Sequence, residues 1–516
     1  MTTLQHPPQP VPDVANALGV LRRMFERFHA DGIRYCHWKS NQHLHASMVG
    51  KTDVDILVDR RAIVPLTRIL GETNFKRFVV KPGRGYPGIE DYVGFDAASG
   101  TLTHLHVHYQ LTLGEKFLKG HRLPWEELFL SSRIRDPEHD IYVAEPNLEL
   151  VVLIVRAVMK LRARDAILET LGKRYIGGGM LRELRWLAER SDRGRLLEVG
   201  ARLVGEPAAQ LLPDMLAGQG PSLGQLRAFH RRADPRLREY RLYGTAAAVR
   251  QMASREWGII WWKVKNWYLG APTKSTRTLP QGGLTVAFLG ADGAGKSTLT
   301  EEIAEWLSRE VAVVVTYGGS GKGSASLPRR LLQGLAALRR RVGRPRSAPA
   351  GLAPPTNDAE AGRRDKNISL ARLVWVLSLA RERRRRALQA RRAKGRGMIV
   401  LSDRLPQSQF PGWNDGPRLT RWLEVGSWVR RAAARGEQSA FRLAELSPPD
   451  LVVKLHVSPE VASRRKPETP QEQLRTGIDM VKRMQFPGTT RVLDIDAEQP
   501  LDQVLLQAKR AVWESI

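Results

Sequence analysis

Short apolar runs and amphipathic stretches follow one another along this chain in a regional pattern. Between Asp13 and Pro146, β-branched runs such as DVDILVD, FKRFVV and THLHVHYQL alternate with helical patterns. From Asn147 to about Gly270 the pattern becomes almost purely helical, with recurring Leu, Ala and Arg. From Leu284 onward, strand-like and helix-like patterns alternate again as far as the C-terminus. Such alternation predicts a protein of the α/β class.

These patterns divide the chain into parts with different expected folds. The expected parts are a small α/β domain over 13–146, an all-α segment over 147–270, a polar linker over 271–283 and a second α/β domain over 284–516. In the last part we expect a parallel sheet with helices on both faces, because buried-type strands alternate there with longer helical patterns. A length of 516 residues is enough for several hydrophobic cores.

Positive charge is concentrated in one stretch of the second α/β domain. The chain has 82 Lys and Arg against 53 Asp and Glu, a net charge of +29, and the stretch from Gly321 to Gly397 alone has 21 against 4. Residues 321–368 are Arg-rich and lose their apolar period, which predicts a mobile insertion. From Leu370 an apolar stripe with a basic outer face predicts a helix. Such charge suits phosphates, nucleic acid or an anionic membrane surface.

Cysteine content and hydropathy bear on the compartment. The single cysteine, Cys36, cannot form an internal disulfide, and the N-terminus lacks a basic segment followed by an apolar one. We therefore expect a protein of the reducing cytoplasm. Every apolar window is shorter than the roughly 18 uncharged residues that a spanning helix needs.

The segment 255–270 concentrates Trp257, Trp261, Trp262 and Trp267 among basic residues. This composition fits a helix in an anionic membrane interface, which would give peripheral contact with the inner face of the membrane. It also fits a helix that packs its aromatic face between domains, and we favour this second interpretation.

The most specific motif of the chain is GADGAGKST, which satisfies G-x-x-x-x-G-K-[ST] between a hydrophobic strand pattern and a helical pattern. Glycines in such a loop bring backbone amides against nucleotide phosphates, the lysine adds a cation, and the serine hydroxyl is placed to bind Mg²⁺. The alternative is a Gly-rich turn without a ligand, and we favour nucleotide binding. The predicted binding residues are Gly290, Asp292, Gly293, Ala294, Gly295, Lys296, Ser297 and Thr298.

The second α/β domain resembles thymidylate kinases over roughly 284–516. The resemblance is carried by Asp292 within the loop, by MIVLSDR ending in Asp403 and Arg404, and by PPDLVVKLHVSPEVASRRK from Pro448. It implies an ATP- and Mg²⁺-dependent kinase with a P-loop fold.

The resemblance also implies roles for single residues. Asp403 would hold the metal through water, and Arg404 with Arg383 of the basic helix would hold the acceptor phosphate. Arg464 or Arg465 would close over the transferred group as a lid arginine. Phosphoryl transfer needs such cations because two anionic substrates must be held in line. Together with Lys296, the predicted catalytic residues are therefore Asp403, Arg404, Arg464 and Arg465.

The acceptor is left open by departures from the thymidylate kinase pattern. Leu405 and Pro406 stand where an aromatic residue follows the D-R pair, and an N-D-G-P turn follows at 414–417. The Arg-rich insertion also replaces the usual acceptor region. We expect a small anionic acceptor, either a nucleoside monophosphate or a phosphorylated or acidic sugar.

The first domain resembles an uncharacterised nucleotidyltransferase-like family over about 15–145. The D-x-D of DVDILVD places Asp53 and Asp55 on one face of a strand, where they could share Mg²⁺. Lys39-Ser40 stands where a Gly-Ser turn is usual, and His106 or His108 matches the third carboxylate. The alternative is an edge strand whose acidic residues face water.

The favoured hypothesis is a kinase fused to a nucleotidyltransferase-like domain. The alternative is an NTP-sensing binding protein whose basic insertion contacts nucleic acid or a partner. Nucleic-acid readers usually interleave aromatic with basic residues, and Gly321 to Gly397 contains only Trp375, so we do not favour nucleic acid.

Overall fold

The computed structural model describes the chain in two compact units, Met1–Val264 and Lys265–Ile516. The described residues are 17–80, 85–114, 118–161, 176–217, 220–268, 277–317, 370–411, 413, 416–424 and 427–516. The predicted insertion at 321–368 and part of the predicted linker lie outside them. Each unit contains parallel strand pairs and helices, so the prediction of an α/β protein is confirmed.

The first unit is built around a mixed sheet with the strand order β3-β4-β5-β2-β1-β9-β8. β2 pairs with β5 in parallel, whereas β4 pairs antiparallel with both β3 and β5. A separate hairpin joins β6 and β7. The strands are β1 (Tyr35–His37), β2 (Val54–Val58), β3 (Phe75–Val80), β4 (Ile89–Asp96), β5 (Thr101–His108), β6 (Leu111–Leu113), β7 (His121–Leu123), β8 (Ile134–Arg135) and β9 (Tyr142–Val143).

Helices cover both faces of this sheet because its strands alternate side chains between the two faces. The short helices among the strands are α1 (Gly19–Ala30), η1 (Asn41–His43), α2 (Leu44–Met48), η2 (Arg60–Ala62), α3 (Ile63–Glu72) and α4 (Glu126–Ser131). One core joins α1 and α3 to the β2 face that carries Val54, Ile56 and Val58. A second core contains Trp38 and Leu57 together with the helices that follow the sheet in sequence.

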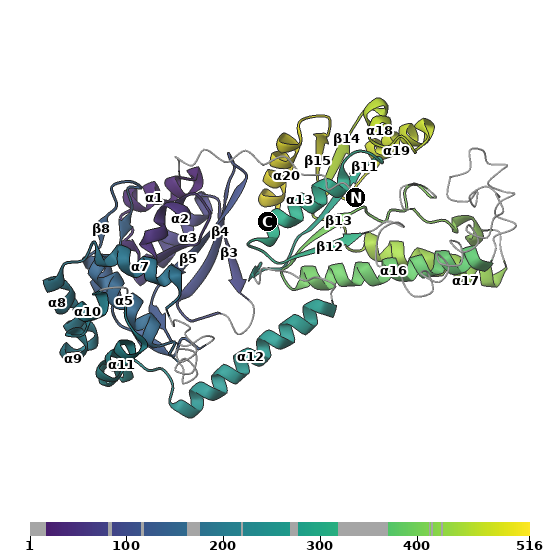
Figure 1. The fold of residues 1–516 in the computed structure, drawn as a ribbon. Coiled ribbons are helices and arrows are strands. Elements are labelled where there is room, and N and C mark those ends of the chain that lie inside the picture. Colours follow the sequence, from purple (N-terminus) through teal and green to yellow (C-terminus); the bar gives the residue numbers. More distant parts are fainter. Residues whose placement is uncertain are drawn as a thin grey trace, which may run out of the picture. The chain divides into compact units, whose positions relative to one another are not determined.

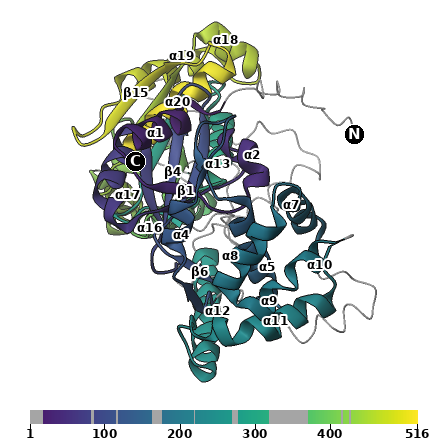
Figure 2. The ribbon, with the colours of Figure 1, turned by 90° about the vertical axis from the view of Figure 1, so that its left-hand side faces the viewer.

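A helical group follows the last strand of the first unit. Its members gather side by side in both ribbon views (Figure 1, Figure 2) and contribute to the second core. They are α5 (Pro146–Val158), α7 (Gly178–Ala188), α8 (Arg193–Val204), α9 (Glu206–Ala209), α10 (Leu212–Leu216) and α11 (Leu223–Arg238). α5 is almost entirely buried, since its side chains from Leu150 to Val155 are all apolar.

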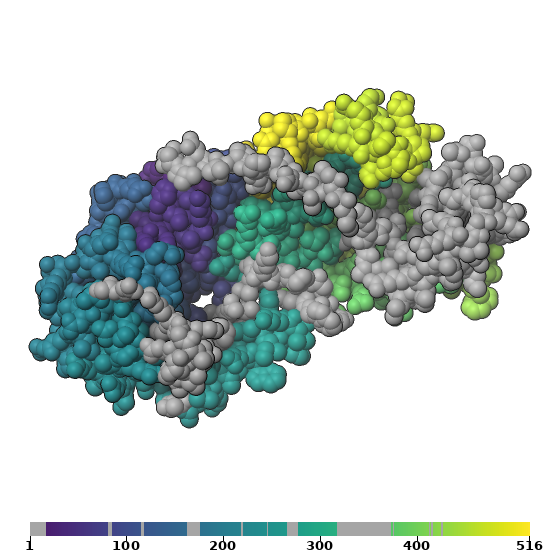
Figure 3. All heavy atoms as spheres, in the orientation of Figure 1, coloured from purple at the N-terminus to yellow at the C-terminus, as the bar shows by residue number. Residues whose placement is uncertain are grey.

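The Trp-rich segment forms part of a long helix, α12 (Thr245–Tyr268), which lies at the surface (Figure 3). Trp257, Ile260, Trp261 and Val264 recur with helical spacing, and the exposed fractions of Trp257 and Trp261 are 69% and 60%. The two interpretations of this segment stay predictions. Within the described ranges, no helix has the length and apolar character needed to cross a membrane.

The second unit is a parallel sheet with the strand order β12-β13-β11-β14-β15. α13 and α20 lie on one face, and α16 lies on the other with α17 beside it (Figure 1). Its strands are β11 (Thr285–Gly290), β12 (Val313–Tyr317), β13 (Ile399–Asp403), β14 (Leu451–His456) and β15 (Arg491–Asp496), and the short β10 (Arg277–Thr278) is not part of this sheet. The helices are α13 (Lys296–Ser308), α16 (Leu370–Gly395), η3 (Thr420–Leu423), α17 (Trp428–Glu445), α18 (Pro459–Arg465), α19 (Gln471–Arg483) and α20 (Leu501–Ser515).

A buried carboxylate connects α5 to the turn after β1. Glu149 is 2% exposed, and its two oxygens accept hydrogen bonds from the Asn41 backbone N–H at 2.9 Å and from Asn41 Nδ2 at 2.6 Å. Burial disfavours the charged form and raises the pKa of Glu149 to about 7, although the bonds from Asn41 oppose this shift. Folding therefore retains a proton that an unfolded glutamate would release.

This retained proton should make the stability of the first unit depend on pH. The folded pKa lies above the unfolded value of about 4.3, so the stabilisation is full at low pH and is lost as the pH rises through about 7. Between about pH 4.3 and about pH 7, the free energy of unfolding should fall by an amount on the order of 3 kcal/mol. Urea unfolding of the full chain between about pH 5 and pH 8 should show this slope in the wild type and not in Glu149→Gln. Glu189→Gln, at an exposed glutamate, is the control and should keep the slope; an equal slope in both variants would contradict the assignment.

Candidate functional site

The predicted phosphate loop connects β11 to α13 and is shaped by glycines. Gly293 and Gly295 have φ angles of +87° and +90°, a region that L side chains rarely adopt. A Cβ on Gly293 would lie 2.8 Å from the backbone oxygen of Ala462, and one on Gly290 would lie 3.0 Å from that of Leu455. The sequence has glycine here because the backbone turns sharply and because β14 and α18 approach it closely.

Lys296, at the start of α13, folds back over this loop. It is 8% exposed, and its Nζ donates hydrogen bonds to the carbonyl oxygens of Gly290 at 2.8 Å and Ala291 at 2.7 Å. Asp292 Oδ1 lies 3.8 Å from the same Nζ. The ammonium group is thus held beside the loop, next to the exposed Ser297 and Thr298 at the helix N-terminus. Charge and helix dipole both favour an anion at this place.

Ser297 and Asp403 meet at the ends of two adjacent elements. β11 and β13 pair in parallel with Phe288 opposite Asp403, which brings the end of β13 beside the loop. Ser297 Oγ donates a hydrogen bond to Asp403 Oδ2 at 2.8 Å. Asp403 is 6% exposed, and its Oδ1 has no hydrogen-bond partner among the described residues.

Ser297 Oγ and Asp403 Oδ1 fit the predicted magnesium site. A buried carboxylate oxygen without a partner costs free energy unless a cation or water satisfies it. Mg²⁺ takes oxygen ligands, and a serine hydroxyl beside a carboxylate supplies two of them, directly or through water. Ser297 and Asp403 are therefore the residues that would hold Mg²⁺ at the phosphate loop.

Arg404 follows Asp403 in a strained conformation and reaches the same loop. Its φ angle is +94°, which is unusual for a residue with a side chain. Ser402 Oγ donates a hydrogen bond to the Arg404 carbonyl at 2.7 Å and helps to hold the turn. Arg404 Nη2 lies 3.0 Å from Asp292 Oδ1, so the structure brings together two residues that the sequence placed 112 positions apart.

The predicted lid arginines belong to α18, which lies against the loop. Arg465 Nη1 lies 3.4 Å from the Gly293 carbonyl oxygen, and its Nη2 donates to the Ala497 carbonyl at 3.1 Å. Arg464 is exposed. Arg465 thus contacts the phosphate loop, and Arg464, the residue before it in the helix, faces solvent.

Arg383 lies away from the loop contacts, between α16 and α17. It is 3% exposed, with its guanidinium carbon 5.2 Å from the Phe441 ring centroid. It lines a cavity of about 580 Å³, which extends along the sheet face under α16 and also includes Ser402 and Leu405. Three further basic residues line this cavity and were not predicted as site residues: Arg386, Arg391 and Lys394. Their helical spacing from Arg383 could have indicated them.

A second polar cluster occupies one face of the sheet in the first unit. Asp55 on β2 pairs in register with His106 on β5, so side chains at alternate positions of both strands share this face. Asp53 Oδ1 lies 2.9 Å from His104 Nδ1, and Asp55 Oδ1 lies 3.2 Å from His106 Nδ1. Each predicted metal carboxylate therefore has a histidine of β5 as its neighbour.

Asp55 is already surrounded by cationic and donor groups. Its Oδ1 lies 2.8 Å from Lys39 Nζ and 3.4 Å from His108 Nε2. Burial alone would raise the pKa of Asp55, but Lys39 and the histidines outweigh burial and hold the pKa well below its usual range. The ligand atoms of Asp55, His106 and His108 lie within 4.8 Å of one another, but two of the three are imidazole nitrogens, whereas Mg²⁺ prefers oxygen ligands, so this cluster suits Mg²⁺ less well than the phosphate loop does. The metal role of Asp53 and Asp55 stays a prediction.

Asp91 and Lys119 also belong to this cluster, and neither was predicted from the sequence. Asp91 on β4 lies opposite His106 in the sheet register, and its Oδ1 is 2.8 Å from His104 Nε2. It supplies a third carboxylate beside the D-x-D strand. Burial, and then the charge of Lys39, lowers the pKa of Lys119 to about 8. Asp91 lies in the strand sequence IEDYVGFD, whose three acidic residues gave no signal that would single out Asp91.

Alanine substitutions at three glycines should show how much stability depends on the backbone geometry of the phosphate loop. Gly293→Ala combines a strained φ angle with a clash, so the free energy of unfolding should fall by about 1–3 kcal/mol. Gly295→Ala adds only the strain because its Cβ would meet open space. Gly488→Ala, with neither, is the control and should change it by less than about 0.5 kcal/mol. Equal thermal unfolding midpoints for all three variants would contradict this account.

Comparison with known proteins places ATP-binding proteins among the relatives of this chain. No family model matches it. An uncharacterized ATP-binding protein of Escherichia coli K12, YghR, is 28% identical over 251 residues, which are 47% of this chain and 94% of YghR. A second uncharacterized ATP-binding protein of the same strain, YghS, is 26% identical over 232 residues, which are 45% of this chain and 93% of YghS.

Proposed function

We propose that the second unit is a kinase that binds ATP with Mg²⁺ and transfers a phosphoryl group to a small anionic acceptor. The observation that carries this proposal is the Ser297–Asp403 contact of 2.8 Å, which leaves Asp403 Oδ1 available beside a glycine-shaped phosphate loop. Relatives named as ATP-binding proteins support the nucleotide part of the proposal. The P-loop itself would also suit an NTP-driven switch, so the kinase part depends on the arginines.

Different groups of the loop contact different parts of the bound nucleotide. Backbone amides from Gly293 to Ser297 and the N-terminus of α13 bind the phosphates of ATP. Lys296 exchanges its bonds to the Gly290 and Ala291 carbonyls for bonds to phosphate oxygens. Ser297 and Asp403 would hold Mg²⁺, which would offset negative charge on the transferred group.

The arginines act on the acceptor and on the charge that develops during transfer. An oxygen of the acceptor forms a bond to the γ-phosphorus while the bond to the β,γ-bridging oxygen breaks and ADP leaves. Arg404, positioned through Asp292 at 3.0 Å, stands where it can hold the acceptor anion. Arg464, one residue before the bracing Arg465, is the lid cation that can close over the transferred group.

The acceptor class follows from charge and space beside Ser402. The cavity of about 580 Å³ is large enough for a nucleoside monophosphate or a sugar phosphate, and several of its lining residues are basic. Arg383, buried at its wall, would meet an anionic group bound in this cavity. A thymidylate-kinase-like nucleoside monophosphate and a phosphorylated or acidic sugar are the two candidate acceptors.

Replacement of the loop lysine tests the kinase directly. Lys296→Ala should lower phosphoryl transfer by about 100-fold or more, because a cation that contacts the transferred group is lost from a water-poor site. The assay follows ADP and the mass of the phosphorylated product with ATP, Mg²⁺ and a panel of nucleoside monophosphates and sugar phosphates. Lys482→Ala, at an exposed lysine of α19, should leave the rate unchanged. Absence of turnover with every acceptor in folded wild-type protein would overturn the proposal.

Replacement of the strand-end carboxylate tests the magnesium assignment. Asp403→Asn keeps the shape and the bond to Ser297 but removes the negative charge, so the Mg²⁺ concentration for half-maximal rate should rise at least about tenfold. A titration of rate against Mg²⁺ at saturating ATP measures it. Asp502→Asn, at an exposed position of α20, is the control. An unchanged Mg²⁺ requirement in Asp403→Asn would assign the metal to other groups.

A further inference from the structure

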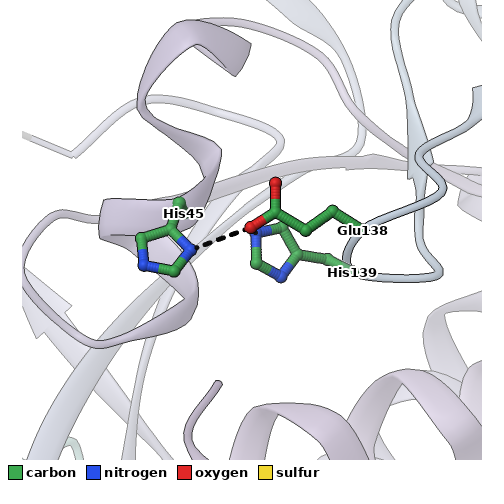
Figure 4. A group of neighbouring side chains, drawn as sticks. All are labelled: His45, Glu138 and His139. Carbon is green, nitrogen blue, oxygen red and sulfur yellow. Dashed lines mark hydrogen bonds and ion pairs between the residues drawn. The ribbon is translucent and has the colours of Figure 1, made fainter. Parts of the chain in front are cut away.

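A group of histidine and glutamate side chains lies on the first unit, apart from the Asp55 cluster. His45 belongs to α2, and Glu138 with His139 belongs to the turn between β8 and β9 (Figure 4). The two segments are 93 residues apart in sequence at their closest contact. The fold therefore brings two imidazoles and a carboxylate together from separate elements.

The separations between the polar atoms match those between ligands of one metal ion. His45 Nδ1 lies 3.2 Å from Glu138 Oε1, and His139 Nε2 lies 3.5 Å from the same oxygen. All three atoms lie within 4.8 Å of one another. Ligand atoms about 2.0–2.2 Å from a tetrahedral Zn²⁺ are about 3.3 Å apart, so one ion can reach all three after small rotations.

His139 gives an independent reason to expect a ligand. Its side chain is 7% exposed, and its Nε2 has no hydrogen-bond partner in the described part of the chain. A buried ring nitrogen without a partner loses its bonds to water on folding and gains none in return, which destabilises the fold. The turn is fixed around it, because the His139 backbone N–H donates to Asp136 Oδ2 at 2.8 Å and Arg135 Nη2 donates to Asp140 Oδ2 at 2.8 Å. The ring is thus held with Nε2 toward Glu138 and His45.

An ordinary ion pair accounts for only part of this arrangement. His45 and Glu138 are 40% and 67% exposed, and an ion pair between such exposed groups contributes little to stability because water screens it. It explains their proximity but leaves His139 Nε2 unsatisfied. Two imidazole nitrogens and one carboxylate oxygen form a donor set that suits Zn²⁺ and similar transition metals, whereas Mg²⁺ and Ca²⁺ prefer oxygen donors alone.

We propose that His45, Glu138 and His139 bind one Zn²⁺ ion. Three protein ligands leave one coordination position open. Glu138 and His139 also line a cavity of about 360 Å³, together with His29 and Glu26, so the open position adjoins a space that a small ligand or water can enter. The ion links α2 to the β8–β9 turn and stabilises the fold around β1, which pairs with β9.

Zinc binding by the full-length chain tests this site. Protein without an affinity tag is stripped with a chelator and titrated with Zn²⁺ by calorimetry, and Co²⁺ is used as a probe whose visible absorption reports tetrahedral coordination. The wild type should bind one equivalent whose affinity falls at least about tenfold in His139→Ala and in Glu138→Gln. Because Glu138 is 67% exposed, Glu138→Gln keeps the fold if His139→Ala does not.

Matched controls separate this site from the rest of the chain. His43→Ala removes an exposed neighbour of the site and should bind Zn²⁺ as the wild type does. His106→Ala removes a member of the Asp55 cluster and should also keep the equivalent. Loss of binding in His106→Ala alone, or equal affinity in the wild type and Glu138→Gln, would overturn the proposal. Zn²⁺ should raise the thermal unfolding midpoint of the wild type and not that of Glu138→Gln.

Discussion

The arrangement of the second unit depends on the parallel pairing of β11 with β13 on one side and β14 on the other. Parallel strands bring their carboxyl ends to one edge, and chain connections that diverge from a central strand open a crevice there. Gly290, Asp403 and the end of β14 meet at this edge for that reason. The Ser297–Asp403 hydrogen bond, the strained turn at Arg404 and the packing of α18 on the loop all require this pairing.

The phosphate loop could be predicted because the residues that form it are adjacent in the sequence. Glycines, Lys296 and Ser297 occupy a few consecutive positions, and the strand before them and the helix after them are local patterns. The fold class followed from the same alternation of patterns. The position of Asp403 beside Ser297 was expected for a different reason, since a resemblance to a known family supplied a long-range neighbour that spacing alone could not.

Contacts between distant segments could not be predicted from periodicity. The sequence suggested that Asp53 and Asp55 share a face, but nothing in it indicated that Lys39 Nζ would lie 2.8 Å from Asp55 Oδ1. Asp91 reaches the cluster through an antiparallel register, which depends on how β4 meets β5. The meeting of His45 with Glu138 depends on the placement of β9 beside β1. Each of these is a property of sheet order, which local hydrophobic patterns do not encode.

The close approach of Gly293 to Ala462 has a consequence for motion. No side chain separates the two backbones, so α18 cannot move inward, and an outward movement would expose the Gly293 carbonyl and release Arg465 from it. The helix can therefore move away from the loop only if the contact between Arg465 and the Gly293 carbonyl breaks. A side chain at position 293 would push α18 away from the loop, so the glycine fixes how closely the helix and the loop can approach.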